Sequence, residues 1–402
     1  MVQSRDPTGR IEPRGALHGI RVVDMTTAIL GPYATRIFGD LGADVIKVES
    51  PVSELVPRHG GPQRSSGMGA LHMSVNRNKR SVRLDLQKPK NAAAAKALIE
   101  TSDVFIHSVR QRSIEKLGLA YEQVKALNEK LVYVHCSGYG SGGPYSGRQA
   151  YDDLIQGASG MTDLLGRRNG TDAPAYLPSL LADKTAGLHA AYAVLAALFH
   201  RERHGEGQFI EVPMFECVVS FHLVENLWGA VFDPPLSEAV FPRNVDSERR
   251  PVKAKDGFIC LMPAGRDGWL AFFRAVGRED VLESAEFREV GRQPTSPKGF
   301  YDVVEQVAQT KTVAEWLELL DVANVPVMKS QTMGELFDDE HLQSVGFFER
   351  RRHPTEGAIL STAHPVLFGR TPAVTSTDAR RLGDDTEAVL SEIGMTIDDV
   401  EI

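Results

Sequence analysis

Short apolar runs rich in β-branched residues recur through the first third of the chain, and helical stretches separate most of them. The runs read IRVVDM, DVIKVE, SVRLDL, DVFIHSV and LVYVHCS. The helical stretches include residues 32–41, 91–100 and 121–128. This alternation is typical of parallel strands, because a parallel pair must be joined by a long crossover that is usually a helix. The pattern predicts an α/β fold with a large Rossmann-like domain whose sheet is mostly parallel and doubly wound.

The remaining chain divides at a stretch rich in proline and charge. With 402 residues the chain is long enough for more than one domain. We expect residues 1–228 to form the first part of the large domain and residues 229–256 to form a linker. Residues 257–335 open with a strand, FICLMP, and continue with helical patterns, which predicts a smaller α/β domain. The tail over 341–402 ends in an acidic helix, and its pattern does not say which domain it joins.

A long helix rich in alanine and leucine is predicted over residues 184–204. Asp183 stands where an N-cap residue would, and Gly205 follows the last helical residue, as a left-handed C-cap does. A capping aspartate usually has no further role. The positive end of a helix and the neighbouring Lys184 would, however, favour the ionised carboxylate that a nucleophile needs. Both interpretations of Asp183 stay open at this point.

Charge and cysteine content narrow the function classes. The formal net charge of −8 argues against nucleic-acid and anionic-membrane partners, which require a clustered basic excess. Cys136, Cys217 and Cys260 lie far apart without CxxC spacing, so we expect a reducing, cytoplasmic location. The first residues lack the apolar core of a secretory signal, and no apolar run reaches the roughly 18 residues of a membrane-spanning helix. These features predict a soluble protein.

Two familiar patterns occur without the context that they need. Residues 138–143, GYGSGG, match GxGxxG, but Pro144 follows them and no second strand ends in an acid about 20 residues later, so no dinucleotide cofactor is expected. His200 and His204 are four apart on a predicted helix, but HRERH lacks the order HExxH. We expect a solvated helix end there and predict no metal site.

A basic cluster lies just before the third apolar run. Residues 76–81 read NRNKRS, with two asparagines beside three basic side chains. Such a group could hold several phosphate oxygens through charge-assisted hydrogen bonds, or it could form a surface patch. The residues alone favour neither alternative.

Four long segments together resemble the family III CoA-transferases, a group that also includes α-methylacyl-CoA racemase. The segments are LHGIRVVDMTTAILGPYATRIFGDLGADVIKVESP, SVNRNKRSVRLDL, GYGSGGPYSGRQAYDDLIQGASGM and ADKTAGLHAAYAVLAALFHRERHGEGQFIEVPM. The resemblance covers nearly the whole chain. It implies an enzyme that takes acyl-CoA and a carboxylic acid as substrates and holds no permanently bound cofactor.

The resemblance also implies roles for individual residues. The family's nucleophilic aspartate precedes a long helix that ends in a GxGQ turn, and the match here is Asp183 before GEGQ at residues 205–208. Asp152, beside Tyr151, resembles an acidic position that assists in some members. The remaining matches are predicted to contact CoA: Asn78, Lys79 and Arg80 at its nucleotide, and Ala28, Ile29, Val109, Arg110, Lys116 and Met214 along its path.

In the proteins that this chain resembles, two subunits are interlinked like links of a chain, each with a large Rossmann-like domain and a small domain. The resemblance therefore implies an interlinked homodimer in which residues 341–402 return to the large domain. Its active sites would lie between the large domain of one subunit and the small domain of the other.

Three functions remain as hypotheses. The first is transfer of CoA between acids through an aspartyl-CoA thioester on Asp183. The second is racemisation of 2-methylacyl-CoA, which needs two proton-transfer groups. Racemases carry a histidine at the position of Tyr151, and a tyrosine with a pKa of about 10 is a poor base at neutral pH. The third is a non-catalytic CoA-binding protein, which the presence of Asp183 disfavours.

Overall fold

The computed structural model describes residues 15–51, 58–290 and 299–401 and divides into two compact units. The large unit takes in the described residues up to Ser159, then Leu177–Phe221, and then those from Val345 onward. The small unit comprises Gly160–Tyr176 and His222–Ser344. The exact domain ranges expected from the sequence stay a prediction.

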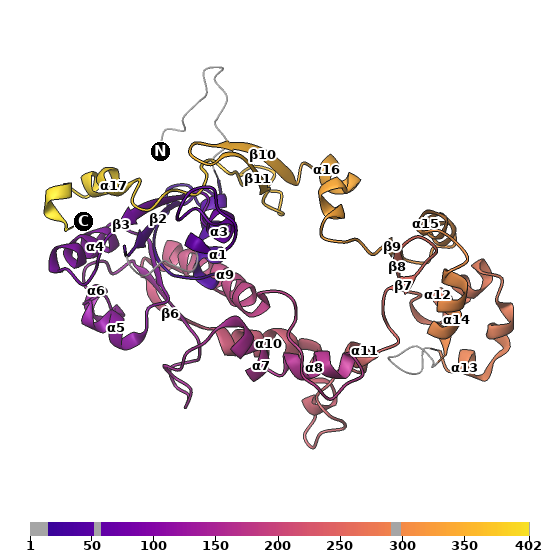
Figure 1. Cartoon of the computed structure of the whole chain (residues 1–402). Coiled ribbons are helices and arrows are strands. Elements are labelled where there is room, and N and C mark those ends of the chain that lie inside the picture. Colours follow the sequence, from indigo (N-terminus) through magenta and orange to yellow (C-terminus); the bar gives the residue numbers. More distant parts are fainter. Residues whose placement is uncertain (1–14, 52–57, 291–298, 402) are drawn as a thin grey trace. The chain divides into compact units, whose positions relative to one another are not determined.

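The large unit is built on a six-stranded sheet in the order β3-β2-β1-β4-β5-β6 (Figure 1). Every strand pairing in this sheet is parallel, which confirms the predicted sheet. The strands are β1 (Arg21–Met25), β2 (Asp44–Glu49), β3 (Lys79–Arg83), β4 (Val104–His107), β5 (Val132–Ser137) and β6 (Gln208–Pro213). Their side chains are mostly buried, except in β6, because helices cover both faces of a parallel sheet.

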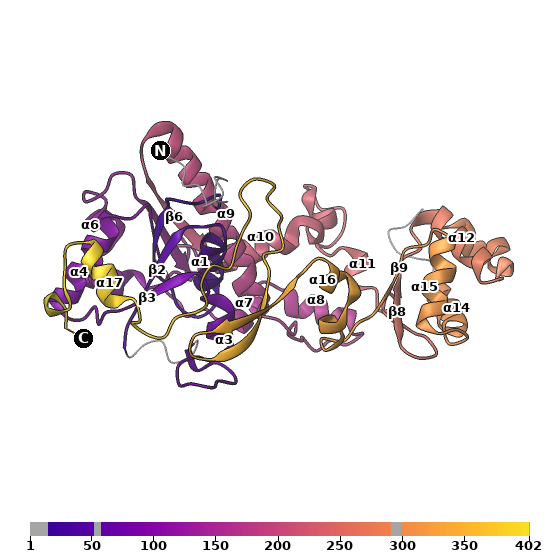
Figure 2. The same ribbon diagram turned by 90° about the horizontal axis from the view of Figure 1, so that it is seen from above.

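Two layers of helices enclose the sheet (Figures 1 and 2). One face is covered by α1 (Leu30–Asp40) and α9 (Leu181–His204), which pack on each other. The other face is covered by α4 (Pro89–Glu100), α5 (Gln111–Lys116), α6 (Tyr121–Val124) and α17 (Thr386–Glu392). A core cluster joins strand residues such as Ile46 and Phe105 to Leu98, Ile114 and Val389 of these helices.

Residues from Val345 onward belong to the large unit. They form an antiparallel hairpin of β10 (Phe348–His353) and β11 (Gly357–Thr362), then α17 and the 3-10 turn η4 (Ile397–Asp399). Asn91 at the start of α4 exchanges two hydrogen bonds with the backbone of Glu401. The large unit also contains α3 (Ala70–Val75), α7 (Asp152–Ala158) and most of α10 (Met214–Asn226). The last residues of α10 belong to the small unit.

Helix α9 confirms the predicted long helix, and Gly205 caps its end with a φ of 81°. Asp183 is not its N-cap, so that prediction was wrong. The N-cap is Leu180, and Asp183 is the third helical residue. The first amides of a helix have no partner within it, and the backbone N–H of Asp183 donates to the carboxylate of Asp152 instead.

The small unit has a three-stranded antiparallel sheet, β7-β8-β9, covered by helices. Its core is aromatic and contains Trp269, Phe272, Phe273 and Trp316. The elements of this unit are α8 (Met161–Arg168), η1 (Trp228–Val231), α11 (Pro242–Val245), β7 (Val252–Lys253), β8 (Phe258–Leu261), α12 (Gly265–Ala275), η2 (Glu279–Glu283), α13 (Ala285–Arg288), α14 (Phe300–Ala308), α15 (Val313–Val322), β9 (Val327–Lys329), η3 (Glu335–Asp338) and α16 (Glu340–Ser344). Among the described residues, no helix is long and apolar enough to cross a bilayer.

Candidate active site

The carboxyl ends of β1 and β4 mark the point where the strand order of the large sheet reverses. Chain connections leave these neighbouring strands in opposite directions, and such a point is where open α/β sheets bind ligands. The turn after β1 holds Ala28 and Ile29, and the turn after β4 holds Val109 and Arg110. The backbone N–H of Thr27 donates to the Ser108 hydroxyl at 3.0 Å and so joins the two turns. Four predicted CoA-lining residues therefore share one edge of the sheet.

Asp183 lies beside the first of these turns. Its Oδ1 accepts the backbone N–H of Leu30, the first residue of α1, at 3.2 Å. The carboxylate thus occupies the positive end of α1, where anions are favoured. Gly187, one turn further along α9, makes this approach possible, because a Cβ there would lie 2.8 Å from the Leu30 carbonyl oxygen.

Asp152 holds the start of α9 from α7. This buried carboxylate accepts the N–H of Asp183 at 3.0 Å through Oδ2 and the side-chain amide of Gln156 at 2.5 Å through Oδ1. Gln156 in turn contacts the backbone of Leu177 and Ser179, which lead into α9. Tyr151 is the N-cap of α7 and is 65% exposed. The structure therefore brings the predicted residues Asp183, Asp152 and Tyr151 to one place.

The electrostatic setting of Asp183 differs from the one expected from the sequence. Burial, with the negative charge of Asp152 adding to it, raises the pKa of Asp183 to about 6, and the Leu30 N–H only partly offsets this. The ammonium of Lys184 does not stabilise the carboxylate, because it donates to the Ser179 hydroxyl at 2.7 Å. At pH 7 roughly nine in ten copies of Asp183 would still be ionised. The site therefore holds a poorly solvated carboxylate.

The three residues predicted at the CoA nucleotide lie elsewhere, at the amino end of β3. The ammonium of Lys79 is 2% exposed and donates to Asp24, to the Pro32 carbonyl and to Asn76. The side chain of Asn78 bonds Asp40 and the backbone at residues 374–377. The guanidinium of Arg80 forms ion pairs with Asp44 and Glu392. All three side chains have internal partners, and their contact with the CoA nucleotide stays a prediction.

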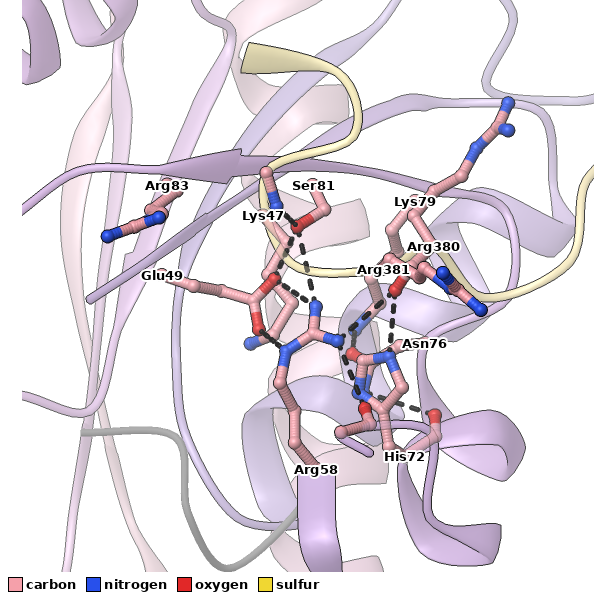
Figure 3. Close-up of polar contacts among 12 residues, drawn as sticks. Lys47, Glu49, Arg58, His72, Asn76, Lys79, Ser81, Arg83, Arg380 and Arg381 are labelled. Carbon is pink, nitrogen blue, oxygen red and sulfur yellow. Dashed lines mark hydrogen bonds and ion pairs between the residues drawn. The ribbon is translucent and has the colours of Figure 1, made fainter. Parts of the chain in front are cut away.

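A second group of buried charges lies at the carboxyl end of β2. Figure 3 shows Arg58 between Glu49 and His72, and both nitrogens that face Glu49 lie 2.7 Å from its carboxylate oxygens. Burial alone would raise the pKa of Glu49, but Arg58 and Lys47 outweigh it and keep the pKa below its ordinary value. Burial and Arg58 lower the pKa of His72 to about 3, so its ring is neutral. A buried ion pair and a neutral imidazole therefore lie beside the switch point, at the end of β2.

A cavity that the sequence does not predict lies at the same edge. It has a volume of about 240 Å³ and is lined by Pro51, Arg83, Asp85, Lys88 and Glu401. The guanidinium of Arg83 points away from the group around Glu49 (Figure 3), and its Nε has no hydrogen-bond partner within the part of the chain that the structure describes. Nothing in the run SVRLDL distinguishes Arg83 from any outward-facing strand residue, so only the fold identifies it.

The last two predicted residues lie in different settings. Met214 begins α10 directly after β6 and is buried, and Lys116 is the exposed last residue of α5. Met214 therefore follows the carboxyl end of a strand, where a CoA path along this edge would pass, whereas the length of α5 separates Lys116 from the end of β4.

Comparison with known proteins gives consistent matches over nearly the full chain. A family model described as CoA-transferase family III matches residues 17–386. A succinate–glutarate CoA-transferase of Agrobacterium fabrum is 29% identical over 391 residues, which cover 94% of this chain and 95% of that protein. A probable fatty acyl-CoA transferase of Mycobacterium tuberculosis is 30% identical over 338 residues, 81% and 85% of the two chains. The crystal structure of a CaiB/BaiF family protein from Brucella suis superposes with a TM-score of 0.80 at 24% identity, over 94% of this chain and 100% of that one.

Proposed function

This chain belongs to CoA-transferase family III and is a CoA-transferase, and we propose that it moves coenzyme A from an acyl-CoA donor to a carboxylic acid through a thioester on Asp183. The observation that carries the proposal is the position of Asp183. Its carboxylate lies at the sheet's switch point with Oδ1 held by Leu30. Its Oδ2 accepts no hydrogen bond from any described residue and so is available for attack.

The proposed reaction begins when Oδ2 of Asp183 attacks the thioester carbonyl of the donor. The carbon–sulfur bond breaks, which gives an aspartyl-acyl anhydride and the CoA thiolate. The thiolate attacks the aspartyl carbonyl and releases the donor acid, so that CoA is now bound to Asp183. The acceptor carboxylate then repeats these two steps in reverse and leaves as the new acyl-CoA. Burial and Asp152 raise the pKa of Asp183 to about 6, so the attacking carboxylate is both ionised and poorly solvated at neutral pH.

We propose that Asp152 and Tyr151 act with Asp183. The contact between Asp152 and the Asp183 N–H supports a positioning role for Asp152. Tyr151 directly precedes Asp152, and its exposed phenol is available to a substrate. We propose that Ala28, Ile29, Val109 and Arg110 line the path of CoA, because their turns adjoin the nucleophile.

Trapping the covalent intermediate tests the proposal. Incubation with a competent acyl-CoA, followed by hydroxylamine and mass spectrometry of peptides, should reveal an adduct on Asp183. Asp183→Ala should lose the adduct and the transfer activity. Asp153→Ala removes an exposed acid from the same α7 turn as Asp152 and should retain both. Transfer by Asp183→Ala at a rate comparable with wild type would refute the covalent mechanism.

We also propose that the active form is a homodimer, because α9 is apolar on two faces. One face packs inside the large unit through residues such as Ala190 and Val194. The other presents Leu188, Tyr192, Leu195 and Phe199, which are 36–62% exposed and recur at helical spacing. A helix with apolar residues all round is usually buried, so a second copy is the expected cover. Tagged and untagged dimers mixed without denaturant should not exchange subunits if the chains are interlinked.

We propose a reducing cytoplasmic location because the cysteine thiols form no disulfide. Cys136, Cys217 and Cys260 are all unpaired. Burial raises the pKa of Cys136 and raises that of Cys217 to about 11, which makes both unreactive. Cell fractionation would test the location.

A further inference from the structure

A buried carboxylate lies at the start of the turn that follows β1. Asp24, the fourth residue of β1, is 0% exposed and accepts four hydrogen bonds. Its Oδ1 accepts the backbone N–H and the hydroxyl of Thr26 at 2.9 and 2.5 Å. Its Oδ2 accepts the hydroxyl of Thr35 on α1 at 2.6 Å and the ammonium of Lys79 on β3 at 3.1 Å. This carboxylate therefore joins the start of the turn to α1 and to β3.

Two lysines of the neighbouring strands hold the backbone of the same turn. Lys47 of β2, which is paired in register with Asp24, donates to the carbonyl of Thr26 at 2.8 Å. Lys79 of β3 donates to the carbonyl of Pro32, in the first turn of α1, at 3.0 Å. Both lysines are labelled in Figure 3, and each is only 2% exposed. The segment over residues 26–32 is thus held at both ends by buried charged groups.

The backbone between these two ends has a conformation that needs support. Ala28 has a φ of 61°, in the left-handed region that a residue with a Cβ rarely adopts. Gly31 packs so closely on Thr26 that a Cβ there would lie 2.2 Å from the Cβ of Thr26. A conformation of this kind persists only where the surrounding structure fixes it from several sides. The hydrogen bonds of Asp24 and of the two lysines supply such contacts.

This turn presents a backbone donor to the proposed nucleophile. The N–H of Leu30 lies within the held segment and donates to Oδ1 of Asp183 at 3.2 Å. Three residues earlier, the N–H of Thr27 joins the turn to the Ser108 hydroxyl. A movement of the turn would therefore change the contact between Leu30 and Asp183.

Stability alone does not account for a charged network at this place. An apolar pair of similar volume is often as stable as a buried ion pair, because burying two charges costs their hydration. A buried network in which each polar group has a partner does, however, fix one geometry. We propose that Asp24, Thr26 and Lys79 are positioning residues, which hold the turn so that the Leu30 N–H meets the carboxylate of Asp183. None of the three touches the reacting atoms. The inference rests on the proposed function, because that function makes Asp183 the nucleophile.

Loss of the Thr26 hydroxyl should make Asp183 harder to ionise. Burial and Asp152 raise the pKa of Asp183 to about 6, whereas the Leu30 N–H lowers it. A looser turn weakens the contact with Leu30, so the pKa of Asp183 should rise further.

The substitution Thr26→Val changes no charge around Asp183. The elements that pack there contribute these titratable side chains: Tyr33 of α1, Asp152 and Tyr151 of α7, and Lys184 of α9 itself. All of them remain, as do both ions of the pair between Asp24 and Lys79. A rise in the pKa of Asp183 would therefore come from the geometry of the turn.

The test is single-turnover formation of the Asp183 adduct from an acyl-CoA, followed by mass spectrometry between pH 5 and pH 7.5. The ion pair of the network stays largely charged over this range. Burial lowers the pKa of Lys79 only to about 8, and Lys79 and Lys47 keep the pKa of Asp24 below its ordinary value against the effect of burial.

Thr26→Val should slow adduct formation about tenfold at pH 7 and move its acid limb upward by as much as about one pH unit, the effect of one lost hydrogen bond of ordinary strength. Thr26→Ala also removes the hydroxyl but cannot clash with the Asp24 oxygen, and it should move the limb in the same direction. Thr26→Ser keeps the hydroxyl and should behave as wild type. Tyr133→Phe is the matched control, because it removes a buried hydroxyl of the same sheet that donates to the Leu119 carbonyl at 3.0 Å. It should change neither the rate nor the limb.

Three outcomes would overturn the inference. If Thr26→Val and Thr26→Ala keep the rate and the acid limb of wild type, the network does not position the turn. If Thr26→Ser is impaired as strongly as Thr26→Val, the hydroxyl is not the link. If Tyr133→Phe shifts the limb equally, the cause is a general loosening of the sheet. Failure of wild type to form any adduct would instead reject the proposed function, and with it the basis of this inference.

Discussion

Replacing Asp183 with asparagine should stabilise the protein at neutral pH while it abolishes transfer. Asparagine keeps the size of the side chain and an oxygen for the Leu30 N–H, but it removes a charge from a partly buried place. The pKa of Asp183 rises from 3.8 to about 6 on folding, chiefly through burial and next through Asp152. At about 1.4 kcal/mol per pKa unit, the charge costs at most about 3 kcal/mol of folding free energy. Because part of the carboxylate contacts solvent, we expect a gain of about 1–3 kcal/mol.

The stability gained by Asp183→Asn should increase as the pH rises from 4 to 6. Below pH 4 the carboxylate is protonated in both the folded and the unfolded chain, and the substitution should gain little. Between pH 4 and pH 6 the unfolded chain ionises first, so the folded chain binds more protons and loses stability as the pH rises. Above pH 6 both are ionised and the loss is constant. The gain from Asp183→Asn should therefore appear over this window and remain up to pH 8.

Denaturant midpoints of wild type and Asp183→Asn at pH 4.5 and pH 8, at one protein concentration, provide the measurement. Asp153→Asn, at an exposed acid on α7, is the matched control and should shift neither midpoint. A gain of equal size at both pH values would show that the asparagine acts through packing. No gain at pH 8 would mean that the carboxylate is not held in an unfavourable environment, and the account of its reactivity would be wrong.

Four further predictions concern the proposed site and the large sheet. The rate of covalent adduct formation in single-turnover experiments should fall about tenfold per pH unit below pH 6, as Asp183 is protonated, and Asp152→Asn should move this limb to lower pH. Lys79→Met leaves the carboxylate of Asp24 buried without its ammonium partner and should lower the free energy of unfolding by about 3–5 kcal/mol in denaturant titrations. Arg83→Ala removes a guanidinium from the cavity at the end of β3 and should weaken CoA binding by about 1–3 kcal/mol, in a salt-dependent way, as measured by calorimetry. In deuterated buffer, mass spectrometry should find no deuterium at the α-carbon of 2-methylacyl-CoA, and rapid entry would favour the racemase hypothesis.

The parallel sheet could be predicted because its central strands are buried on both faces and therefore read as continuous apolar runs. β6 was missed because its sequence, QFIEVP, mixes polar and apolar residues. Most of its residues are exposed or partly exposed, so it lacks the buried apolar run that identifies β1, β2, β4 and β5. The start of α9 was misplaced because the side chain that accepts a hydrogen bond from its first turn belongs to another helix. That side chain is Asp152 of α7, which is 31 residues away from Asp183 in the sequence.

Asp183 could be proposed as the nucleophile from a family resemblance in the residues around it, whereas its environment depends on contacts between distant residues. The sequence places Asp183 at a helix start, but it cannot show that Lys184 turns to Ser179 or that Asp152 faces the same amide. The basic cluster before β3 was ambiguous for the same reason. Whether Lys79 meets a phosphate or an internal carboxylate depends on Asp24, which lies two strands away in the sheet.

The carboxyl edge of the large sheet is supported by different chemistry on its two sides. On the β1 and β2 side, the buried carboxylates of Asp24 and Glu49 are paired with Lys79 and Arg58. Burial alone would raise the pKa of Asp24 and of Glu49, but these cations keep both values below the ordinary range. On the β4 and β5 side, two neutral imidazoles are stacked. Mild acid leaves the paired carboxylates ionised, and burial, which lowers the pKa of His107 and of His135, keeps the stacked rings neutral as well. A loss of transfer in mild acid should therefore begin at Asp183, whose pKa burial raises to about 6, while the ion pair of Glu49 with Arg58 and the packing of α1 on α9 persist.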